Sequence, residues 1–471
     1  MRKIALILAI IMILTPLMVS CENNQTSKPS STADKQDNPE LEYSIDNLPE
    51  IDMNQEEFRS YSGKNSSGTT YYDYETGDLM NDAVYQRKVA IEEKFNVQIK
   101  GDNSTLDDPS GEFKRFILSD DHTYDIFHGK QNDAMTEMIL DGYFVDWSEL
   151  DYVDYTKPYW NTSLAKTVNY SGKVYFMAGD YSLSTYNSTN CIMFNKNLFD
   201  DLGIAYPYQD VYDYTWTIDK LIDISRQGYA DLNGSSQWEK EEDRTGYAGW
   251  YWEMYPALYF GMGGQTVITN EDNMPELNLN SERTVKILDK MIELFDGHYA
   301  WSYGTGYGTH NTAFDSGRLL MRDTMLYWLE MNRGLEFDAS IVPYPMLNEE
   351  QGQYYSRSGP SFSYCVYIPV TNEQLEETGI ILEAMAIEGY NRIRPVYYDI
   401  TLDLKAASDE ETRDMVDIIL ETAIYQNETM LTPYDMNKII SSKTNTFASW
   451  FASREEYFEG LVDDIADYYA A

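Results

Sequence analysis

The stretch from Lys173 to Lys196 constrains the fold more than any other part of the chain. Two short apolar runs, rich in β-branched, aromatic and methionine side chains, flank a polar segment over 181–189. Runs this short predict buried strands rather than helices. Directly downstream, 197–202 predicts a short helix that Gly203 ends in the left-handed conformation, and 216–228 predicts a second helix. A segment with this pattern can leave one lobe of a protein and enter the next.

Predicted strands and helices alternate along most of the chain. Gly389 is expected to end one of the helices, Asn280 or Ser281 to cap another, and Ser408 with Glu411 to form a capping box. The order favours an α/β fold with mostly buried strands. The predicted strands are 97–99, 124–128, 337–345 and 364–368, and the further helices are 80–95, 281–295, 371–388, 408–424 and 454–468.

The first 45 residues resemble the leader of a bacterial lipoprotein. Arg2 and Lys3 precede an apolar run over 4–13 that is too short to span a membrane and is typical of an export signal. Cys21 follows a small residue, as in a lipobox, which implies a signal peptide over 1–20, a palmitate-type lipid on Cys21 and anchoring to the outer face of the cytoplasmic membrane. An ordinary secretory signal is the alternative. The polar segment 21–45 is expected to be a disordered tether.

Charge and cysteine usage exclude some classes of protein. The 471 residues include 35 Lys and Arg against 78 Asp and Glu, a formal net charge of −43. Nucleic-acid binding needs a basic footprint, so the balance argues against nucleic-acid partners. Cys191 and Cys365 lie in apolar runs and are expected to be buried free thiols, with a disulfide as the alternative. No cysteine spacing is typical of zinc.

A series of short motifs follows in a fixed order between residue 71 and the C-terminus. They are Tyr124-Asp125-Ile126-Phe127, 142–148, Lys157-Pro158-Tyr159-Trp160, the 173–216 stretch, 314–320, 337–345 and 395–399. In order and spacing they resemble extracellular solute-binding proteins of ABC importers, in the sugar-binding group that includes maltose-binding protein. The resemblance implies a two-lobed, type II periplasmic-binding-protein-like α/β fold. Each lobe would have a mixed sheet with flanking helices, and a hinge would join the lobes around a ligand cleft.

The resemblance also implies how the chain divides and what it contacts. The N-terminal lobe is expected to comprise 46–185 and 313–362, and the C-terminal lobe 186–312 and 363–471. The expected partners are an oligosaccharide, the permease subunits of an ABC transporter and, through Cys21, the membrane. The protein is expected to be a monomer.

Clustered aromatic residues are the candidate ligand contacts. Sugars present apolar faces with a rim of hydroxyls, so aromatic rings near carboxylates and amides suit them, although any one Trp can equally pack in a core. Alternating glycines at 304, 306 and 308 favour a loop and hence exposure of Trp301 and Tyr303. The predicted ligand-binding residues are Asp180, Trp250, Trp252, Trp301, Tyr303, Trp328 and Gln131.

The segment 231–242 has the register of a calcium loop. Calcium prefers oxygen ligands at this spacing with a carboxylate last. Ser236 replaces the usual glycine at the sixth position, and a plain polar turn is the alternative. The predicted ligands are Asp231, Asn233, Ser235, Glu239 and Glu242.

The predicted function is capture of a carbohydrate and its delivery to a permease, without catalysis. No nucleophile-elbow, phosphate-loop or zinc-protease motif occurs in the sequence. A glycosidase needs only two carboxylates, so a surface-anchored carbohydrate-active enzyme remains the alternative. The same fold binding a peptide or another polar solute is a further alternative.

Overall fold

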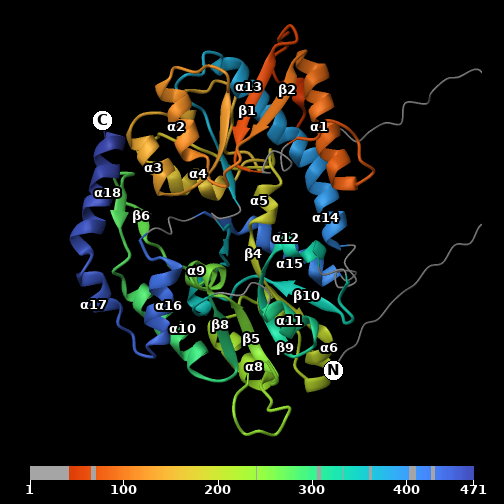
Figure 1. Ribbon diagram of the computed structural model, residues 1–471, viewed down its shortest axis with the longest axis vertical. Coiled ribbons are helices and arrows are strands. Elements are labelled where there is room, and N and C mark those ends of the chain that lie inside the picture. Colours follow the sequence, from red (N-terminus) through yellow and green to blue (C-terminus); the bar gives the residue numbers. More distant parts are fainter. Residues whose placement is uncertain are drawn as a thin grey trace, which may run out of the picture. The chain divides into compact units, whose positions relative to one another are not determined.

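The computed structural model describes residues 42–64, 71–239, 241–304, 309–331, 334–359, 363–402, 410–425 and 430–470. The predicted signal peptide, Cys21 and Ser408 lie outside these ranges. Within them, no helix is long and apolar enough to cross a membrane. Residues 43–471 form one folded unit around two sheets (Figure 1).

The first lobe is built on a four-stranded sheet with the order β12-β3-β1-β2. β1 runs parallel to β2 and β3, and β12 runs antiparallel to β3. The carboxyl ends of β1, β2 and β3 therefore lie at one edge. The strands are β1 (Glu57–Ser62), β2 (Gln98–Asn103), β3 (Ile126–Lys130) and β12 (Tyr364–Tyr367), and the helices are α1 (Leu79–Phe95), α2 (Ser110–Leu118), α3 (Asp133–Leu140), α4 (Thr162–Val168) and α13 (Leu375–Glu388).

The second lobe is built on a five-stranded sheet with the order β10-β4-β9-β5-β8. β4 is antiparallel to β9 and β10, whereas β5 is parallel to β8 and β9. Every residue of β4 and β9 is buried, as expected for strands at the centre of a covered sheet. The strands are β4 (Asn190–Asn195), β5 (Thr245–Trp250), β8 (Ala300–Tyr303), β9 (Leu319–Met325) and β10 (Ala339–Val342).

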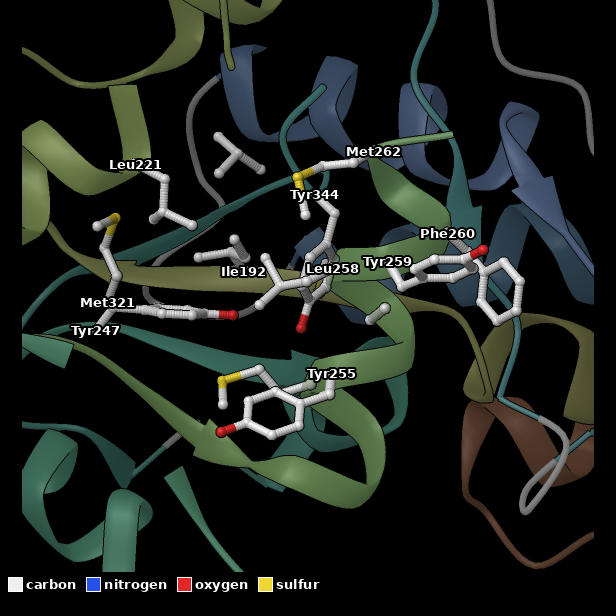
Figure 2. Packing of buried hydrophobic residues seen from close by; sticks show 14 of the residues in the cluster. Ile192, Leu221, Tyr247, Tyr255, Leu258, Tyr259, Phe260, Met262, Met321 and Tyr344 are labelled. Atoms are coloured by element: carbon white, nitrogen blue, oxygen red, sulfur yellow. The ribbon is translucent and has the colours of Figure 1, made fainter. Parts of the chain in front are cut away.

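Helices around this sheet make an aromatic-rich core. Figure 2 shows Tyr247, Tyr255 and Tyr344 near Ile192 and Leu258, all buried. The helices include α6 (Lys196–Leu202), α7 (Tyr208–Tyr212), α8 (Ile218–Gly228), α9 (Tyr251–Gly261), α10 (Glu282–Asp296), α11 (Thr309–Asp315), α12 (Leu326–Met331), α15 (Glu410–Glu421), α16 (Pro433–Ser441), α17 (Phe447–Ala452) and α18 (Glu455–Ala470).

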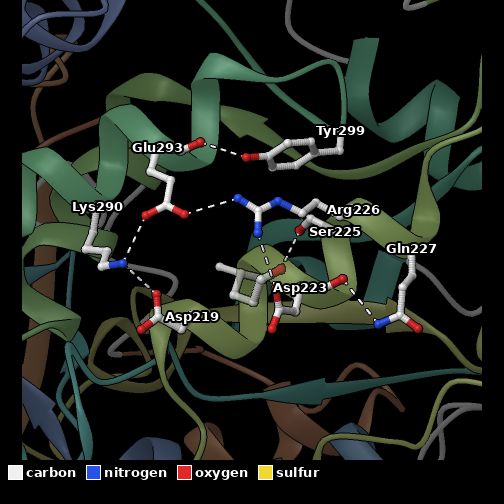
Figure 3. Close-up of polar contacts among 9 residues, drawn as sticks. Asp219, Asp223, Ser225, Arg226, Gln227, Lys290, Glu293 and Tyr299 are labelled. Carbon is white, nitrogen blue, oxygen red and sulfur yellow. Dashed lines mark hydrogen bonds and ion pairs between the residues drawn. The ribbon is translucent and has the colours of Figure 1, made fainter.

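A chain of surface ion pairs links α8 to α10 on the outside of the second lobe. Lys290 Nζ lies 2.7 Å from Asp219 and 2.9 Å from Glu293, and Arg226 lies 3.1 Å from Glu293 (Figure 3). Exposed pairs of this kind add little stability each. Burial of the apolar faces of α8 and α10 therefore contributes most of the free energy that holds these helices on the sheet.

Two segments that join the lobes run side by side with a third segment, which carries β13 and lies between α15 and α16 of the second lobe. The first carries α5 (Ser184–Asn187), and its Thr189 forms an antiparallel bridge with Ser358 of the second. In the second segment β11 (Ser356–Arg357) pairs in parallel with β13 (Ala423–Ile424) of the third. The Ser358 amide donates to the Ile424 carbonyl at 2.8 Å. These backbone hydrogen bonds hold the segments together at the junction between the two lobes.

The remaining strands, β6 (Val267–Thr269) and β7 (Pro275–Leu277), form a hairpin that reaches from the second lobe toward the first. The Ser171 amide donates to the Asn273 carbonyl at 2.9 Å, and Met274 packs against the first core. α18 packs against β7 and contributes Phe458 and Ile465 to the second and first cores respectively.

Most predicted elements are confirmed. The helices near 80–95, 281–295 and 454–468 form as α1, α10 and α18, and the Ser281 hydroxyl caps α10 by accepting from the Thr284 amide. Gly203 ends α6 at φ 66°. Cys191 and Cys365 are free and buried, in different sheets.

Two predicted elements are wrong. Residues 173–178 make isolated bridges rather than a strand, for example Met177 with Val366. The helix expected to end at Gly389 continues through a π-helical turn, Gly389–Ile393, into α14 (Arg394–Leu402). Gly389 has right-handed helical dihedrals, and a Cβ there would collide with the Asp180 carbonyl. The glycine therefore serves a close approach instead of a helix stop.

The predicted lobe boundaries also differ from sheet membership. Within 313–362, expected in the N-terminal lobe, β9 and β10 belong to the second sheet. Within 363–471, expected in the C-terminal lobe, β12 and α13 belong to the first lobe. β9 is buried between β4 and β5, and the next strand along the chain that belongs to the first sheet is β12.

Candidate functional site

A small cavity lies where three strands of the second sheet end. Trp250 is the last residue of β5, Tyr303 is the last residue of β8, and Trp328 lies in α12, directly after β9. We call it the strand-end cavity; its volume is about 30 Å³, and its lining is Trp250, Glu253, Tyr303, His310, Asn311, Asp323, Thr324, Met325 and Trp328. Three of the seven predicted ligand residues therefore meet here, at the edge where open α/β sheets bind ligands.

A neutral histidine lines the strand-end cavity, and a buried arginine contacts Asn311 of the lining. The Tyr303 hydroxyl lies 2.7 Å from His310 Nδ1. Burial, helped by the nearby Arg322, lowers the pKa of His310 to about 3, so the ring is neutral at physiological pH. Arg322 donates a hydrogen bond to the Asn311 side chain and lies over the Phe314 ring at 4.8 Å.

A buried ion pair fixes another part of the cavity wall. Arg357 Nη1 donates to Glu253 Oε2 at 2.5 Å and to Asn190 Oδ1 at 2.8 Å. Arg357 and Glu253 are only 2% and 4% exposed at their side chains. A Cβ on Gly359 would lie 2.9 Å from Glu253 Oε2, so a larger residue would press on the pair. The pair joins the second joining segment to the cavity wall and to the start of β4.

Asp323 is the second carboxyl group of the strand-end cavity. It is fully enclosed and accepts a hydrogen bond from the Tyr344 hydroxyl. Burial raises the pKa of Asp323 to about 8. At neutral pH this carboxyl therefore holds a proton and can both donate and accept.

Asp323→Asn is expected to flatten the dependence of stability on pH. Because the pKa of Asp323 is about 8 when folded and about 3.9 when unfolded, the folded state holds the extra proton between these values. The free energy of unfolding should fall with rising pH there, by about 1.4 kcal/mol per pH unit from this group. Urea unfolding between about pH 6 and about pH 8 should show a slope shallower by that amount in the variant. Equal slopes for the variant, the wild type and the exposed-site control Asp338→Asn would contradict it.

A larger cavity lies at the segments that join the lobes. We call it the crossing cavity; its volume is about 330 Å³. Its lining is Pro158, Trp160, Asn161, Thr162, Ser163, Gly179, Asp180, Thr185, Tyr186, Tyr390, Arg394, Tyr398, Leu420, Glu421 and Ala423. Predicted residue Asp180 therefore lies in a different cavity from Trp250, Tyr303 and Trp328.

Asp180 is held by arginines on two sides. Arg394 Nε lies 3.2 Å from Asp180 Oδ2. Arg87 Nη1 donates to the backbone carbonyls of Asp180 at 3.3 Å and Tyr181 at 2.5 Å. Burial raises the pKa of Asp180 to about 6, and the charge of Arg394 opposes that rise. The carboxylate is charged at neutral pH, and Arg394 balances it.

The other three predicted ligand residues lie apart from both cavities. Trp252 is 39% exposed on α9 and stacks on Tyr251. Trp301 is only 5% exposed, and its Nε1 donates to Thr245 Oγ1 at 3.0 Å. The expected exposure of Trp301 and Tyr303 is wrong, because β8 extends to Tyr303 and both side chains are buried, Tyr303 at 7% exposure. Gln131 lines a third cavity, of about 80 Å³, with mainly apolar neighbours.

The predicted calcium loop closes on itself through hydrogen bonds. Asp231 accepts from the Gly234 and Ser236 amides at 2.7 and 2.9 Å, and Asn233 Nδ2 donates to Glu239 Oε2 at 2.6 Å. Among the described residues, no group of three or more His, Cys, Asp or Glu is arranged to hold a metal ion. Calcium binding by Asp231, Asn233, Ser235, Glu239 and Glu242 stays a prediction.

The sequence analysis missed the charged residues that line the strand-end cavity or contact its lining. Arg322 and Asp323 interrupt the otherwise apolar strand β9. Charged residues in a buried strand must be paired or functional, so this interruption was an available signal. Arg357 and Glu253 lie 104 positions apart, and no local pattern connects them.

Comparison with known proteins shows the fold. No protein-family model and no curated protein matches the chain. Solved structures do match it. An ABC substrate-binding protein from Listeria monocytogenes, in complex with cycloalternan, is 15% identical with a TM-score of 0.52, covering 87% of this chain and 98% of that one. The GacH receptor of Streptomyces glaucescens, solved unliganded and with acarbose, is 13% identical with a TM-score of 0.52, covering 88% and 97%.

A sugar transporter protein from Rhizobium etli, in an open conformation, is 12% identical with a TM-score of 0.57, and the match covers 88% of this chain and 99% of that one. These likenesses extend over nearly the whole of each neighbour. The chain therefore has the two-lobed, type II periplasmic-binding-protein fold.

Proposed function

We propose that this chain is a solute-binding protein that captures a carbohydrate, expected to be an oligosaccharide, between its lobes and delivers it to an ABC transporter permease. The observation that carries the proposal is the strand-end cavity. It brings Trp250, Tyr303 and Trp328 together with two carboxyl groups and the Asn311 amide. Flat rings suit the apolar faces of a sugar, and the polar groups suit its hydroxyls.

The strand-end cavity supplies one side of such a site. Its volume of about 30 Å³ is far below the roughly 300 Å³ at which ligand pockets begin. Closure of the first lobe over the ligand would complete the site. A ligand drives that closure only if it binds the closed arrangement better than the open one.

The neighbours favour this proposal over catalysis. Those described above are a substrate-binding protein, a receptor and a transporter protein, and two are solved with cycloalternan or acarbose. A surface-anchored carbohydrate-active enzyme would release new reducing ends from oligosaccharides on long incubation, whereas a binding protein would not. If the protein binds no tested sugar but binds a peptide, the alternative of the same fold with another class of ligand is favoured.

Trp328→Ala is expected to weaken binding of an oligosaccharide about tenfold to hundredfold, because a buried aromatic contact is worth about 1.5–3 kcal/mol. Isothermal titration with maltotetraose, cycloalternan and acarbose would measure the change. Trp238→Ala is the matched control, since Trp238 stacks on His298 away from the cavity, and it should bind like the wild type. Unchanged affinity in Trp328→Ala would overturn the assignment of the site.

The remaining features of the proposal concern the N-terminus and the predicted metal. The lipobox-like sequence at Cys21 supports anchoring outside the cytoplasmic membrane, and mass spectrometry of the mature protein would reveal a lipid there. Repeating the titrations and melting curves with calcium and with a chelator tests the Asp231 loop. A calcium-dependent rise in melting temperature that Asp231→Ala abolishes would support it.

A further inference from the structure

The crossing cavity has the size of a ligand site in its own right. Its volume is about 330 Å³, against about 30 Å³ for the strand-end cavity and about 80 Å³ for the cavity at Gln131. Sites for small molecules begin at roughly 300 Å³. Of these three cavities, it is the one that can hold a small solute without any movement of the lobes.

The walls of the crossing cavity combine rings with hydroxyl and amide groups. Tyr390 and Tyr398 supply most of the aromatic surface, since Trp160 and Tyr186 are only 2% and 1% exposed, and Asn161, Thr162, Ser163 and Thr185 supply polar groups. This combination matches the apolar faces and hydroxyl rim of a sugar or polyol.

The charges in the crossing cavity favour a neutral occupant. The carboxylate of Asp180 and the guanidinium of Arg394 are 3.2 Å apart and balance each other, and Arg394 also lies over the Tyr390 ring at 4.7 Å. Glu421 adds an acidic group to the lining. The Glu421 carboxylate would repel a bound anion, and the charge of Arg394 is already balanced by Asp180. Binding of an anion is therefore disfavoured.

The position of the crossing cavity relates it to the movement of the lobes. Its lining comes from the first joining segment at 179–186, from the π-helical turn and α14 at 390–398, which lead from α13 of the first lobe to the second lobe, and from the end of α15 and the start of β13 at 420–423. A solute in this cavity touches more than one connection between the lobes at once. Its binding would favour the one lobe arrangement that presents these walls.

We propose that the crossing cavity is a second binding site, separate from the strand-end cavity, for a neutral polyhydroxylated solute of about one sugar ring. Asp180 and Arg394 form its charged base, and the rings of Tyr390 and Tyr398 flank the solute. Occupancy stabilises the segments that join the lobes. The site does not depend on oligosaccharide capture at the strand-end cavity, so the two can be tested separately.

Ser163→Trp fills the crossing cavity with a ring and is the first variant to make. Glucose, xylose and ribitol at millimolar concentration are the probes, with saturation-transfer NMR and isothermal titration as readouts on the full mature chain. Wild type should bind at least one probe, and Ser163→Trp should lose that binding at least tenfold. Ser148→Trp is the control, because Ser148 is exposed and outside both cavities, and it should bind like the wild type.

Asn161→Ser is a second, smaller change in the same cavity, which keeps the test valid if Ser163→Trp does not fold. The Asn161 side chain caps α4 by accepting from the Leu164 amide at 2.7 Å, and serine keeps such a cap while removing the amide from the cavity. It should weaken probe binding severalfold, whereas Trp328→Ala should leave it unchanged. Retained binding in both cavity variants, or no binding of any probe by wild type, would overturn the inference. Lost oligosaccharide binding in Trp328→Ala alone would bear only on the proposed function.

Discussion

Arg357→Met is expected to lower the free energy of unfolding by about 3–5 kcal/mol, because breaking a buried ion pair leaves an uncompensated charge. The partner left behind is Glu253, 4% exposed, whose Oε2 lies 2.5 Å from Arg357 Nη1. Asn190 loses the same donor, at 2.8 Å. Urea unfolding followed by circular dichroism would measure the loss.

A double variant separates the charge from the packing. Glu253→Gln combined with Arg357→Met removes both charges, so it should recover a large part of the stability lost by Arg357→Met. The exposed pair of Lys286 and Glu282 is the comparison, and Lys286→Met should change stability by no more than about 1 kcal/mol. If Arg357→Met had the same free energy of unfolding as the wild type, water would have to reach Glu253. The ion pair would then not stabilise the second joining segment.

The local elements could be predicted because their signals are local. The apolar spacing of 281–295 and the Ser281 cap lie within one helix, and both appear in α10. Gly389 shows the limit of such signals. A glycine after a helical pattern usually ends the helix. Here the missing side chain lets the Asp180 backbone approach closely, and Asp180 lies 209 positions earlier in the chain.

The lobe boundary and the site depended on long-range pairing. β9 lies within 313–362, which was expected in the first lobe, yet its hydrogen bonds go to β4 and β5 of the second sheet. The aromatic clusters in the sequence include Trp250, Tyr303 and Trp328, which meet because three strands end at one edge. Trp301 and Tyr303 come from one sequence cluster that was expected to be an exposed loop, and both pack into the core, since burial is decided by the sheet.

Glu383→Ala is the second change expected to have a large effect, in the first lobe. Glu383 on α13 is 3% exposed and accepts from the Tyr159 hydroxyl at 2.5 Å, Trp160 Nε1 at 2.8 Å and the Asp154 amide at 3.3 Å. Each buried donor left without an acceptor costs about 1–3 kcal/mol. The loss in the free energy of unfolding should therefore reach about 3–5 kcal/mol.

Glu383→Gln tells hydrogen bonding apart from charge. Burial raises the pKa of Glu383, so the site favours a neutral group, and glutamine keeps one oxygen that can accept from Tyr159 or Trp160. Its cost should be about half that of alanine or less, while Glu376→Ala, at an exposed position of the same helix, should stay within about 0.5 kcal/mol of wild type. Equal losses in the free energy of unfolding for the alanine and glutamine variants would mean that the charge of the Glu383 carboxylate holds residues 154–160 against α13. Since Trp160 also lines the crossing cavity, the alanine variant should weaken probe binding there as well, and Glu376→Ala should not.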